Sequence, residues 1–196
     1  MARRYAAAAP DVQIHFIAGS AAGGLRHPFN RNPAARFAQG HVFYGSVCQL
    51  RPESTGEIAL GGSDPLDAPV IWANYLSSPT DRRVVREGLR VVREIFAQSA
   101  FEPYRGEEIA PGPAVQSDAE IDAYVAAAGS TIFHPVGTCR MGVDEAAVVD
   151  ETLKVRGVEG LRVADASVMP KLVSSNTHAP TVMIAEKAAD LILADA

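Results

Sequence analysis

Hydrophobic and polar residues alternate near the start of the chain with the two-residue period of a β-strand. In DVQIHFIA, residues 11–18, the hydrophobic residues Val12, Ile14 and Phe16 are separated by polar side chains. Because successive side chains of a strand point to opposite faces, this pattern predicts a half-buried strand. The next segment, residues 19–40, holds four glycines and two prolines without a new period, which predicts a loop.

A hairpin is predicted directly after this loop. HVFYGSVCQLRP, residues 41–52, is typical of a strand, and ESTG, residues 53–56, is typical of a turn. EIAL, residues 57–60, then predicts a returning strand. We therefore expect residues 41–52 and 57–60 to pair as an antiparallel hairpin.

The period changes to that of a helix in SSPTDRRVVREGLRVVREIFAQ, residues 77–98. One hydrophobic stripe has the spacing four, three and four along this segment: Val85, Leu89, Val92 and Phe96. The stripe predicts an amphipathic helix, and Ser78 or Thr80 is suited to cap its start. The arginines of the segment are predicted to form a solvated face.

Two further helices are predicted toward the C-terminus. In SDAEIDAYVAAAG, Ser117 and Glu120 have the spacing of a capping box, and Gly129 suits the end of the helix. PTVMIAEKAADLILADA, residues 180–196, is hydrophobic around most of its circumference, which predicts a largely buried final helix. Between them LKVRGVEGLRVAD, residues 153–165, predicts two strands around a turn.

Strands mixed with helices, without a steady β-α-β order, favour an α+β fold with an antiparallel or mixed sheet and packed helices. The length of 196 residues suits one domain with a real core. Hydrophobic residues make up 47% of the chain and charged residues 21%, which are ordinary values for a globular protein.

Charge and cysteine content narrow the function classes. The formal net charge of -5 gives no electrostatic reason to expect a nucleic-acid partner. Cys48 and Cys139 lack CxxC spacing, which argues against a disulfide scaffold. No signal peptide and no membrane span are evident in the sequence, so the default expectation for localisation is the cytoplasm.

TIFHPVGTCRMG, residues 131–142, presents His134 between a hydrophobic pair and Pro135. Proline favours an extended backbone at the residue before it, so we expect His134 to be held rigidly at a strand end. The local sequence allows a catalytic base, a metal ligand or a histidine satisfied by a neighbouring carbonyl. A metal site would combine His134 with Cys139 and with Cys48 or His178, but no compact ligand spacing supports it.

The start of the final helix is a second candidate site. In SSNTHAPTVMIAEK, Pro180 suits the first helical position, which makes Ala179 the expected N-cap. Alanine has no side-chain acceptor, so backbone amides including those of Thr181 and Val182 are predicted to attract an anion. The alternative is a cap by Asn176 or Thr177, or hydration by water.

Three motifs in order resemble one known family: FHPVGTCRMG, VVDETLKVRGVEGLRVADASVMP and SSNTHAPTVMIAEKAADLI. They resemble the carboxy-terminal substrate domain of the glucose-methanol-choline (GMC) flavoprotein oxidoreductases, in the alcohol and choline dehydrogenase branch. LRPESTGEIAL, DPLDAPVIWANYLSSPTD and PYRGEE also look like this domain. The resemblance runs over residues 12–196, which leaves residues 1–11 as a poorly defined leader.

The resemblance implies roles for two polar residues in oxidation of a small alcohol with FAD. His134 matches the family's catalytic histidine and would accept the hydroxyl proton. Asn176 matches a second active-site position and would hydrogen-bond the substrate oxygen, because an amide cannot act as a base. The alcohol carbon would pass hydride to flavin N5.

The resemblance also implies cofactor contacts along two segments. Asp165 and Ala166 match a segment that passes close to FAD, and backbone amides are expected to make the contact because a carboxylate repels phosphate. A structural turn role is an equal alternative for Asp165. Thr181 and Val182 match the helix start near the flavin. His178 stands where the family commonly has asparagine, so a flavin contact there is open.

The phosphate-binding part of such an enzyme is not evident in the sequence. Gly19, Gly23 and Gly24 do not have G-x-G-x-x-G spacing, so the chain is expected to lack the Rossmann-type FAD domain. We expect it not to retain FAD alone. Activity would need a separate FAD-binding subunit or a missing N-terminal half, and the alternative is an inert truncated fragment or binding module.

Overall fold

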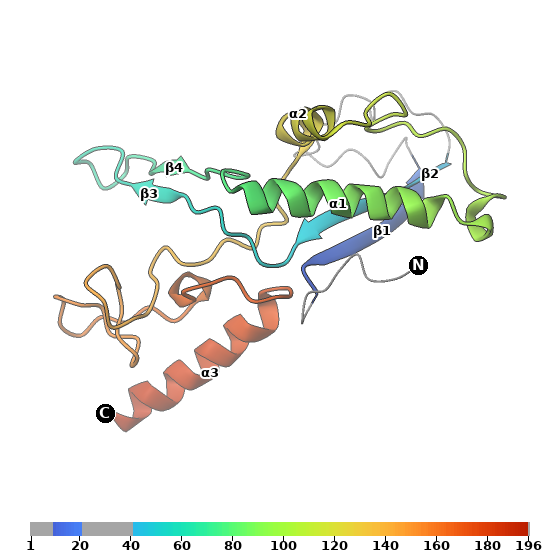
Figure 1. Ribbon diagram of the computed structural model, residues 1–196. Coiled ribbons are helices and arrows are strands. Elements are labelled where there is room, and N and C mark those ends of the chain that lie inside the picture. The colour runs from blue at the N-terminus through green and yellow to red at the C-terminus, as the bar shows by residue number, and fades with distance from the viewer. Residues whose placement is uncertain (1–9, 21–40, 196) are drawn as a thin grey trace. The chain divides into compact units, whose positions relative to one another are not determined.

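The computed structural model describes residues 10–20 and 41–195, and Figure 1 shows the arrangement of their helices and strands. The chain divides into two compact units, each built from two separate stretches. Unit 1 comprises Met1–Gln49 and Leu76–Ile132, and unit 2 comprises Leu50–Tyr75 and Phe133–Ala196. Most of the predicted leader and of the predicted glycine-rich loop lies outside the described residues.

The sheet of unit 1 contains β1 (Val12–Ser20) and β2 (His41–Gln49), which pair antiparallel from Val12 opposite Gln49 to Ser20 opposite His41. The sheet of unit 2 contains β3 (Glu57–Ala59) and β4 (Val70–Trp72), also antiparallel.

The predicted hairpin between residues 41–52 and 57–60 is therefore wrong. β2 runs beside β1 along the full length of both strands, whereas β3 is three residues long. The longer ladder satisfies many more backbone groups, so it determines the partner of β2. β4 was absent from the predicted elements because VIW is too short to show a period.

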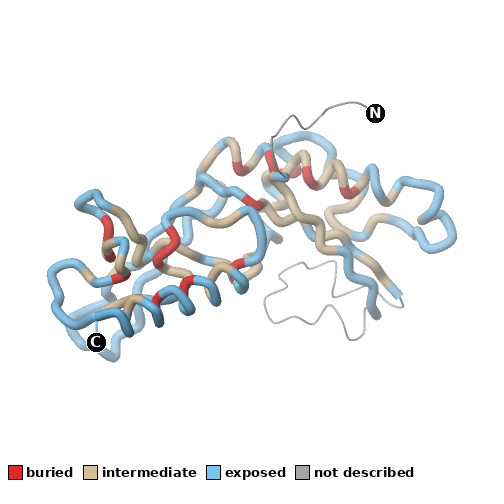
Figure 2. The backbone as a smooth tube through the Cα atoms, turned by 90° about the horizontal axis from the view of Figure 1, so that it is seen from below, coloured by how far each residue is buried: buried red, intermediate tan, exposed pale blue. Residues whose placement is uncertain are grey.

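α1 (Pro79–Phe96) packs on the sheet of unit 1, and Ser78 caps it by accepting a hydrogen bond from the Thr80 amide. Its buried positions are Asp81, Val84, Gly88 and Val92. The buried stripe is thus centred one residue before the predicted one. The remaining positions of α1 are intermediate or exposed, and Figure 2 colours the whole backbone by this burial.

Two contacts explain this shift in the buried stripe. Gly88 lies against β2, where a Cβ atom would meet Val47 Cγ1 at 2.4 Å. Asp81 accepts a hydrogen bond of 2.7 Å from Gln49 Nε2, which joins the first turn of α1 to the end of β2. A buried carboxylate is stable only with such partners, and hydrophobic spacing alone does not reveal it.

A cluster of aromatic rings extends the core of unit 1. Its neighbouring ring centroids lie 5.0–6.2 Å apart, which is the range of attractive aromatic contacts, and its members are Phe16, Phe43, Phe96 and Phe101. Phe101 belongs to η2 (Ser99–Phe101), a short 3-10 helix that follows α1.

α2 (Asp118–Ala128) confirms its sequence prediction at both ends. Ser117 and Glu120 form a reciprocal capping box, and Gly129 is the C-cap. Ile121 is fully buried and anchors the helix.

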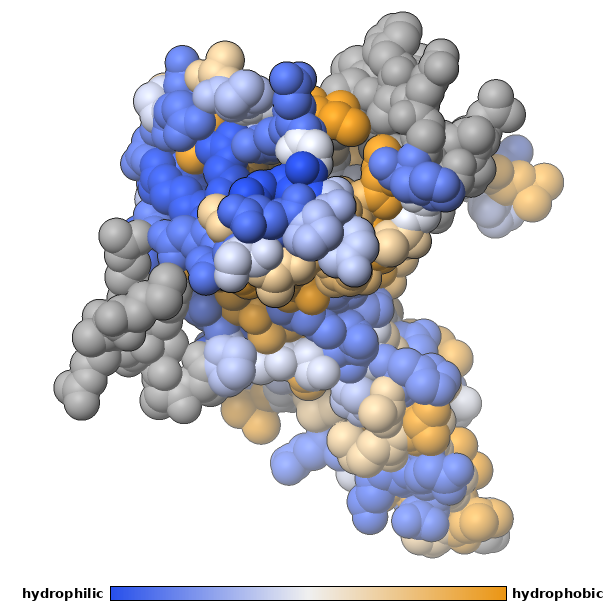
Figure 3. Space-filling model, turned by 90° about the vertical axis from the view of Figure 1, so that its right-hand side faces the viewer, coloured by the Kyte–Doolittle hydropathy of each residue, from blue (hydrophilic) through white to orange (hydrophobic). Residues whose placement is uncertain are grey.

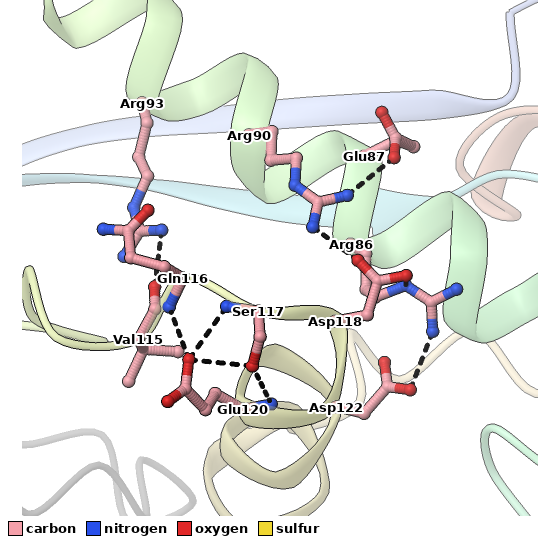
Figure 4. Close-up of polar contacts among 10 residues, drawn as sticks. All are labelled: Arg86, Glu87, Arg90, Arg93, Val115, Gln116, Ser117, Asp118, Glu120 and Asp122. Atoms are coloured by element: carbon pink, nitrogen blue, oxygen red, sulfur yellow. Dashed lines mark hydrogen bonds and ion pairs between the residues drawn. The ribbon is translucent and has the colours of Figure 1, made fainter.

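Ion pairs join α1 to α2 (Figure 4), and Arg93 of α1 also pairs with Glu108 in the segment before α2. Arg86 lies 2.7 Å from Asp122, and Arg90 lies 2.5 Å from Asp118. The side chains of Arg86 and Arg90 are half-buried between the helices, so the prediction of a solvated arginine face is wrong for these two residues. The acidic partners lie on a different helix, and helical spacing within one segment cannot reveal them.

Unit 2 has one hydrophobic core of buried residues: Val149, Leu153, Val168, Met169, Ile184 and Ala188. Lys154 and Arg162 form an antiparallel bridge around the predicted turn, where extended strands were expected. η3 (Ala166–Val168) is a 3-10 helix, and α3 (His178–Ala194) ends the described chain.

α3 is less buried than its sequence predicts. Ile184 and Ala188 are buried, but Ile192 is 48% exposed and Leu193 is 76% exposed. In Figure 2, red and pale blue positions alternate along this helix. The prediction of a largely buried helix is wrong for the described chain, because the core of unit 2 covers one side of α3.

Helices combined with small antiparallel sheets agree with the predicted α+β class. On the face shown in Figure 3, hydrophilic side chains gather over the upper part, with hydrophobic side chains between them. Within the described ranges, no helix is both long enough and apolar enough to span a bilayer.

Candidate functional site

His134 lies in an irregular segment of unit 2 and not at the end of a strand as predicted. The preceding Phe133 has a positive φ of 62°, and Gly137 has a φ of 91°, so tight bends flank the histidine. A residue with positive φ cannot continue a strand, which explains the difference.

Hydrogen bonds tie the rest of this segment to η3. The Cys139 amide donates to the Ser167 carbonyl at 3.0 Å, and the Met141 amide donates to the Val168 carbonyl at 2.9 Å. These bonds keep the backbone after His134 beside the residues that follow Asp165.

The His134 side chain is half-buried and forms no hydrogen bond with another residue in the part of the chain that the structure describes. The interpretation of a histidine satisfied by a neighbouring carbonyl therefore has no support in these residues. Its imidazole nitrogens remain available to a ligand. A neutral imidazole offers one donor and one acceptor, as a proton acceptor requires.

The Asp165 carboxylate caps the start of η3, the short helix that follows it. It accepts hydrogen bonds from the Ser167 amide at 2.8 Å and from Ser167 Oγ at 2.5 Å. This arrangement matches the structural turn role that the sequence left open for Asp165. Ala166 begins η3 and packs against the hydrophobic core.

The start of α3 differs from its prediction in one respect. The N-cap is Thr177 and not Ala179, and the Thr177 side chain makes no capping hydrogen bond. Pro180 is thus the third helical residue. This position tolerates proline, because the first amides of a helix have no intrahelical acceptor.

The change of N-cap also changes which amides are available. The Thr181 amide donates to the Thr177 carbonyl at 3.0 Å and closes the first helical turn. The free helical donors are therefore the amides of His178 and Ala179, two exposed residues that the sequence argument did not select. The sequence signal that could have identified these two amides is a threonine that stands three positions before a proline of the first helical turn.

Asn176 and His178 are exposed on either side of the buried Thr177. Neither side chain forms a hydrogen bond with another described residue. The Asn176 amide group can therefore donate and accept toward a ligand. Val182, with a side chain 46% exposed, follows within the first turns of α3.

The core of unit 2 brings the three predicted site segments together. Val136 and Met141 from the His134 segment pack against the same cluster as Ala166 and Ile184. η3 and α3 are also in direct contact. His134, Asp165 and the start of α3 thus lie on segments that share one core, although no hydrogen bond between described residues joins His134 to Asn176.

A metal centre finds no support in the described ranges. They contain no group of three His, Cys, Asp or Glu side chains placed to hold an ion. Cys48 and Cys139 are free thiols in different units. Burial raises the pKa of Cys48, which disfavours the thiolate that a metal needs.

Comparison with protein families identifies the class of this chain. Residues 52–185 match the model of the GMC oxidoreductase C-terminal domain. The chain belongs to the GMC oxidoreductase family.

Two curated relatives place it near the alcohol and choline dehydrogenases. It is 44% identical over 94% of its length to alcohol dehydrogenase [acceptor] of Pseudomonas putida. It is 48% identical over 93% of its length to mitochondrial choline dehydrogenase of Mus musculus. The matches cover 32% and 30% of these relatives, so the chain spans about a third of their length.

A solved structure supports the fold of the chain. Pyridoxine 4-oxidase from Mesorbium loti matches 92% of this chain with a TM-score of 0.78 and 31% sequence identity. The match covers 34% of that protein. The small sheets and helices described above are therefore the architecture of a GMC oxidoreductase C-terminal region.

Proposed function

We propose that this chain supplies the proton-accepting and substrate-orienting residues of an FAD-dependent oxidation of an alcohol. The observation that carries the proposal is the half-buried His134 side chain without a partner among the described residues, on a segment tied to η3. The names of the relatives point to alcohols as substrates, and a solved neighbour from Chaetomium thermophilum is an FAD-dependent oxidoreductase.

The residues at the start of α3 fit a flavin. The exposed amides of His178 and Ala179, with the positive end of the helix dipole, favour a group that gains negative charge. The Asp165 carboxylate is occupied by Ser167, which leaves backbone groups near Ala166 to face a cofactor. Thr181 and Val182 would border the same group. FAD, when bound, supplies the hydride acceptor.

The two polar residues of the site take different roles in this reaction. His134 accepts the hydroxyl proton on an imidazole nitrogen, because the imidazole ring has one nitrogen with a lone pair that can accept it. Asn176 donates a hydrogen bond from its amide nitrogen to the substrate oxygen and keeps it oriented. As the carbon loses hydride and the oxygen loses its proton, the alcohol becomes an aldehyde or a ketone.

Replacement of His134 tests its role. We expect His134→Ala, in enzyme completed with an FAD-binding portion, to lower kcat by about 10²–10⁴-fold, the usual contribution of a general base. His41→Ala is the matched control, because His41 is an exposed histidine at the start of β2. A loss below tenfold for His134→Ala would remove it from this role.

The second candidate function is a catalytically inert module that keeps the fold. The observation that allows it is that no hydrogen bond between described residues joins His134 to Asn176. Co-production with the FAD-binding portion of the Pseudomonas putida relative separates the two. Gain of bound flavin and of alcohol-dependent dye reduction supports the enzyme, and gain of neither supports the inert module.

A further inference from the structure

Some residues other than glycine have a positive φ within the described ranges: Asn74, Leu76, Phe133 and Leu153. Asparagine tolerates this left-handed conformation, but bulkier residues rarely adopt it, because the Cβ atom comes close to the following carbonyl oxygen. A bulky residue keeps such a backbone only where the surrounding structure holds it, and such positions cluster at functional sites. The leucines and the phenylalanine therefore need an explanation.

Ordinary structure accounts for the two leucines. Leu153 is 4% exposed and belongs to the core of unit 2. The Leu76 carbonyl accepts a hydrogen bond of 2.6 Å from Arg82 Nη1, which fixes the chain before α1. Phe133 differs, because its side chain is 53% exposed and core packing does not explain its backbone. The distinctive feature of Phe133 is its position directly before His134.

The backbone of His134 is restricted from both sides. The left-handed turn at Phe133 comes directly before it, and Pro135 follows it, which disfavours the helical region at His134 itself. Gly137, with a φ of 91°, then turns the chain a second time. The direction of the His134 Cα–Cβ bond is thus set by a short stretch with few allowed conformations.

The far end of this stretch is anchored in unit 2. Val136 packs against the hydrophobic core, and the Cys139 amide donates to the Ser167 carbonyl at 3.0 Å. Phe133 is the first residue of unit 2, so the chain enters the unit through the left-handed turn. Because the residues after His134 are held in place, a change of backbone at Phe133 would displace His134 rather than the core.

We propose that Phe133 is a positioning residue for His134, and that its left-handed backbone sets the direction of the imidazole toward the substrate oxygen. A proton acceptor works only within hydrogen-bond distance of the proton that it takes, and a displacement of about 1 Å costs about 10²-fold in rate. The proposal rests on the proposed role of His134. The placement of the imidazole can be measured without turnover, so the two proposals can fail separately.

Two substitutions separate the backbone of Phe133 from its ring. Phe133→Asn and Phe133→Val both remove the ring, but asparagine tolerates the left-handed region and a β-branched residue does not. In enzyme completed with the FAD-binding portion of the Pseudomonas putida relative, we expect kcat of Phe133→Val to be about tenfold or more below that of Phe133→Asn, with a smaller change in KM. Leu76→Asn and Leu76→Val are the matched controls and should have equal kcat, because Leu76 also has a positive φ but precedes no candidate site residue.

Combination with His134→Ala shows whether Phe133 acts through the histidine. If it does, Phe133→Asn and Phe133→Val have equal kcat once the imidazole is absent. A difference that persists in the His134→Ala background would show a general structural effect and overturn the proposal. Equal kcat of the two Phe133 variants, in an enzyme that needs His134, also overturns it.

The free chain provides a measurement that needs no activity. Diethyl pyrocarbonate modifies accessible imidazole nitrogens, and mass analysis of peptides gives the rate at His134 relative to the exposed His41. We expect this ratio to differ between Phe133→Asn and Phe133→Val by more than it differs between the two Leu76 variants. Equal ratios overturn the proposal, whether or not His134 is the base. Phe133→Ala replaces Phe133→Val if thermal unfolding shows that the valine variant does not fold, since alanine also disfavours the left-handed region.

Discussion

Gly88 is a residue at which α1 approaches β2 closely. A Cβ at this position would lie 2.4 Å from Val47 Cγ1, a branched side chain that cannot move aside freely. Alanine gains about 1 kcal/mol over glycine in a helix interior, but overpacking costs about 1–3 kcal/mol. We therefore expect Gly88→Ala to lower the free energy of unfolding by about 1 kcal/mol, measured by urea denaturation.

The control is Gly106→Ala, because no atom lies within 4 Å of the Cβ position at Gly106. Val47→Ala in the Gly88→Ala background removes the clashing methyl groups, so the two substitutions should be coupled favourably. Additive effects of Val47→Ala and Gly88→Ala would show that the contact between these two side chains does not cause the loss of stability.

Asp144 is held in its ionised form by Arg140, four residues earlier. The hydrogen bonds from the Arg140 guanidinium lower the pKa of Asp144 from 3.8 to about 2. A lowered pKa means that the pair stabilises the fold fully above pH 3.8 and loses this contribution as the pH falls through about 2. We expect carboxyl NMR titration to show a pKa of Asp144 near 2, and Arg140→Gln to move it toward 3.8. An unchanged midpoint in the variant would contradict this cause.

At the residue scale, sequence motifs identified His134 and Asn176 as candidates, but the geometry of the helix start required the structure. Pro180 is compatible with any position of the first turn, so the sequence alone does not distinguish a helix that begins at Pro180 from one that begins at His178. The amides of His178 and Ala179 were missed for this reason. The roles of His134 and Asn176 in catalysis stay predictions.

Arg93 joins α1 to the segment before α2 through several donors at once. Its guanidinium donates to both oxygens of Glu108 and to the carbonyls of Gly112 and Val115, at 2.8–3.1 Å. Lysine keeps the charge but places all its donors on one nitrogen, so it cannot reproduce the planar guanidinium that reaches Glu108 and the two carbonyls together. We expect Arg93→Lys to lower the free energy of unfolding by about 1–2 kcal/mol, measured by chemical denaturation.

Arg83→Lys is the matched control on the same helix, because Arg83 is exposed and has no hydrogen bond or ion pair with another described residue. It should leave stability unchanged within about 0.5 kcal/mol. Equal stability of Arg93→Lys and Arg83→Lys would show that the guanidinium hydrogen bonds of Arg93 contribute nothing to stability beyond the charge.

At the element scale, the sequence correctly predicted features that depend on interactions between residues close together in the chain. α2 was predicted with its ends because Ser117, Glu120 and Gly129 form the cap from within the helix. The partner of β2 was mispredicted because pairing with β1 depends on residues separated by a long stretch of chain. The burial of α3 was overestimated because hydrophobicity indicates that a surface needs cover but not which part of a protein provides it.

At the scale of the whole molecule, segments of the two units alternate along the sequence. Unit 2 takes Leu50–Tyr75 from the middle of the chain and Phe133–Ala196 from its end, so no single boundary in composition or in linker residues separates the units. The sequence therefore predicted one domain over residues 12–196. The candidate site residues that the structure describes all belong to unit 2, where three segments share one core.

Binding of FAD is the property that tests the chain as a whole. A dinucleotide is held mainly through its pyrophosphate, which glycine-rich turns of G-x-G-x-x-G spacing bind at the N-terminus of a helix. The sequence has no such spacing, and the start of α3 offers amides for one small anionic group. A single contact of this kind does not offset the ordering of a large flexible cofactor.

We therefore expect the purified chain to be colourless and to release added FAD on dialysis, as measured by absorbance near the flavin bands. The full-length Pseudomonas putida relative, treated identically, is the positive control. Addition of its amino-terminal portion to this chain should restore retention of flavin if Ala166 and the start of α3 contact the cofactor as proposed. A stoichiometric flavin spectrum from the isolated chain would contradict this expectation.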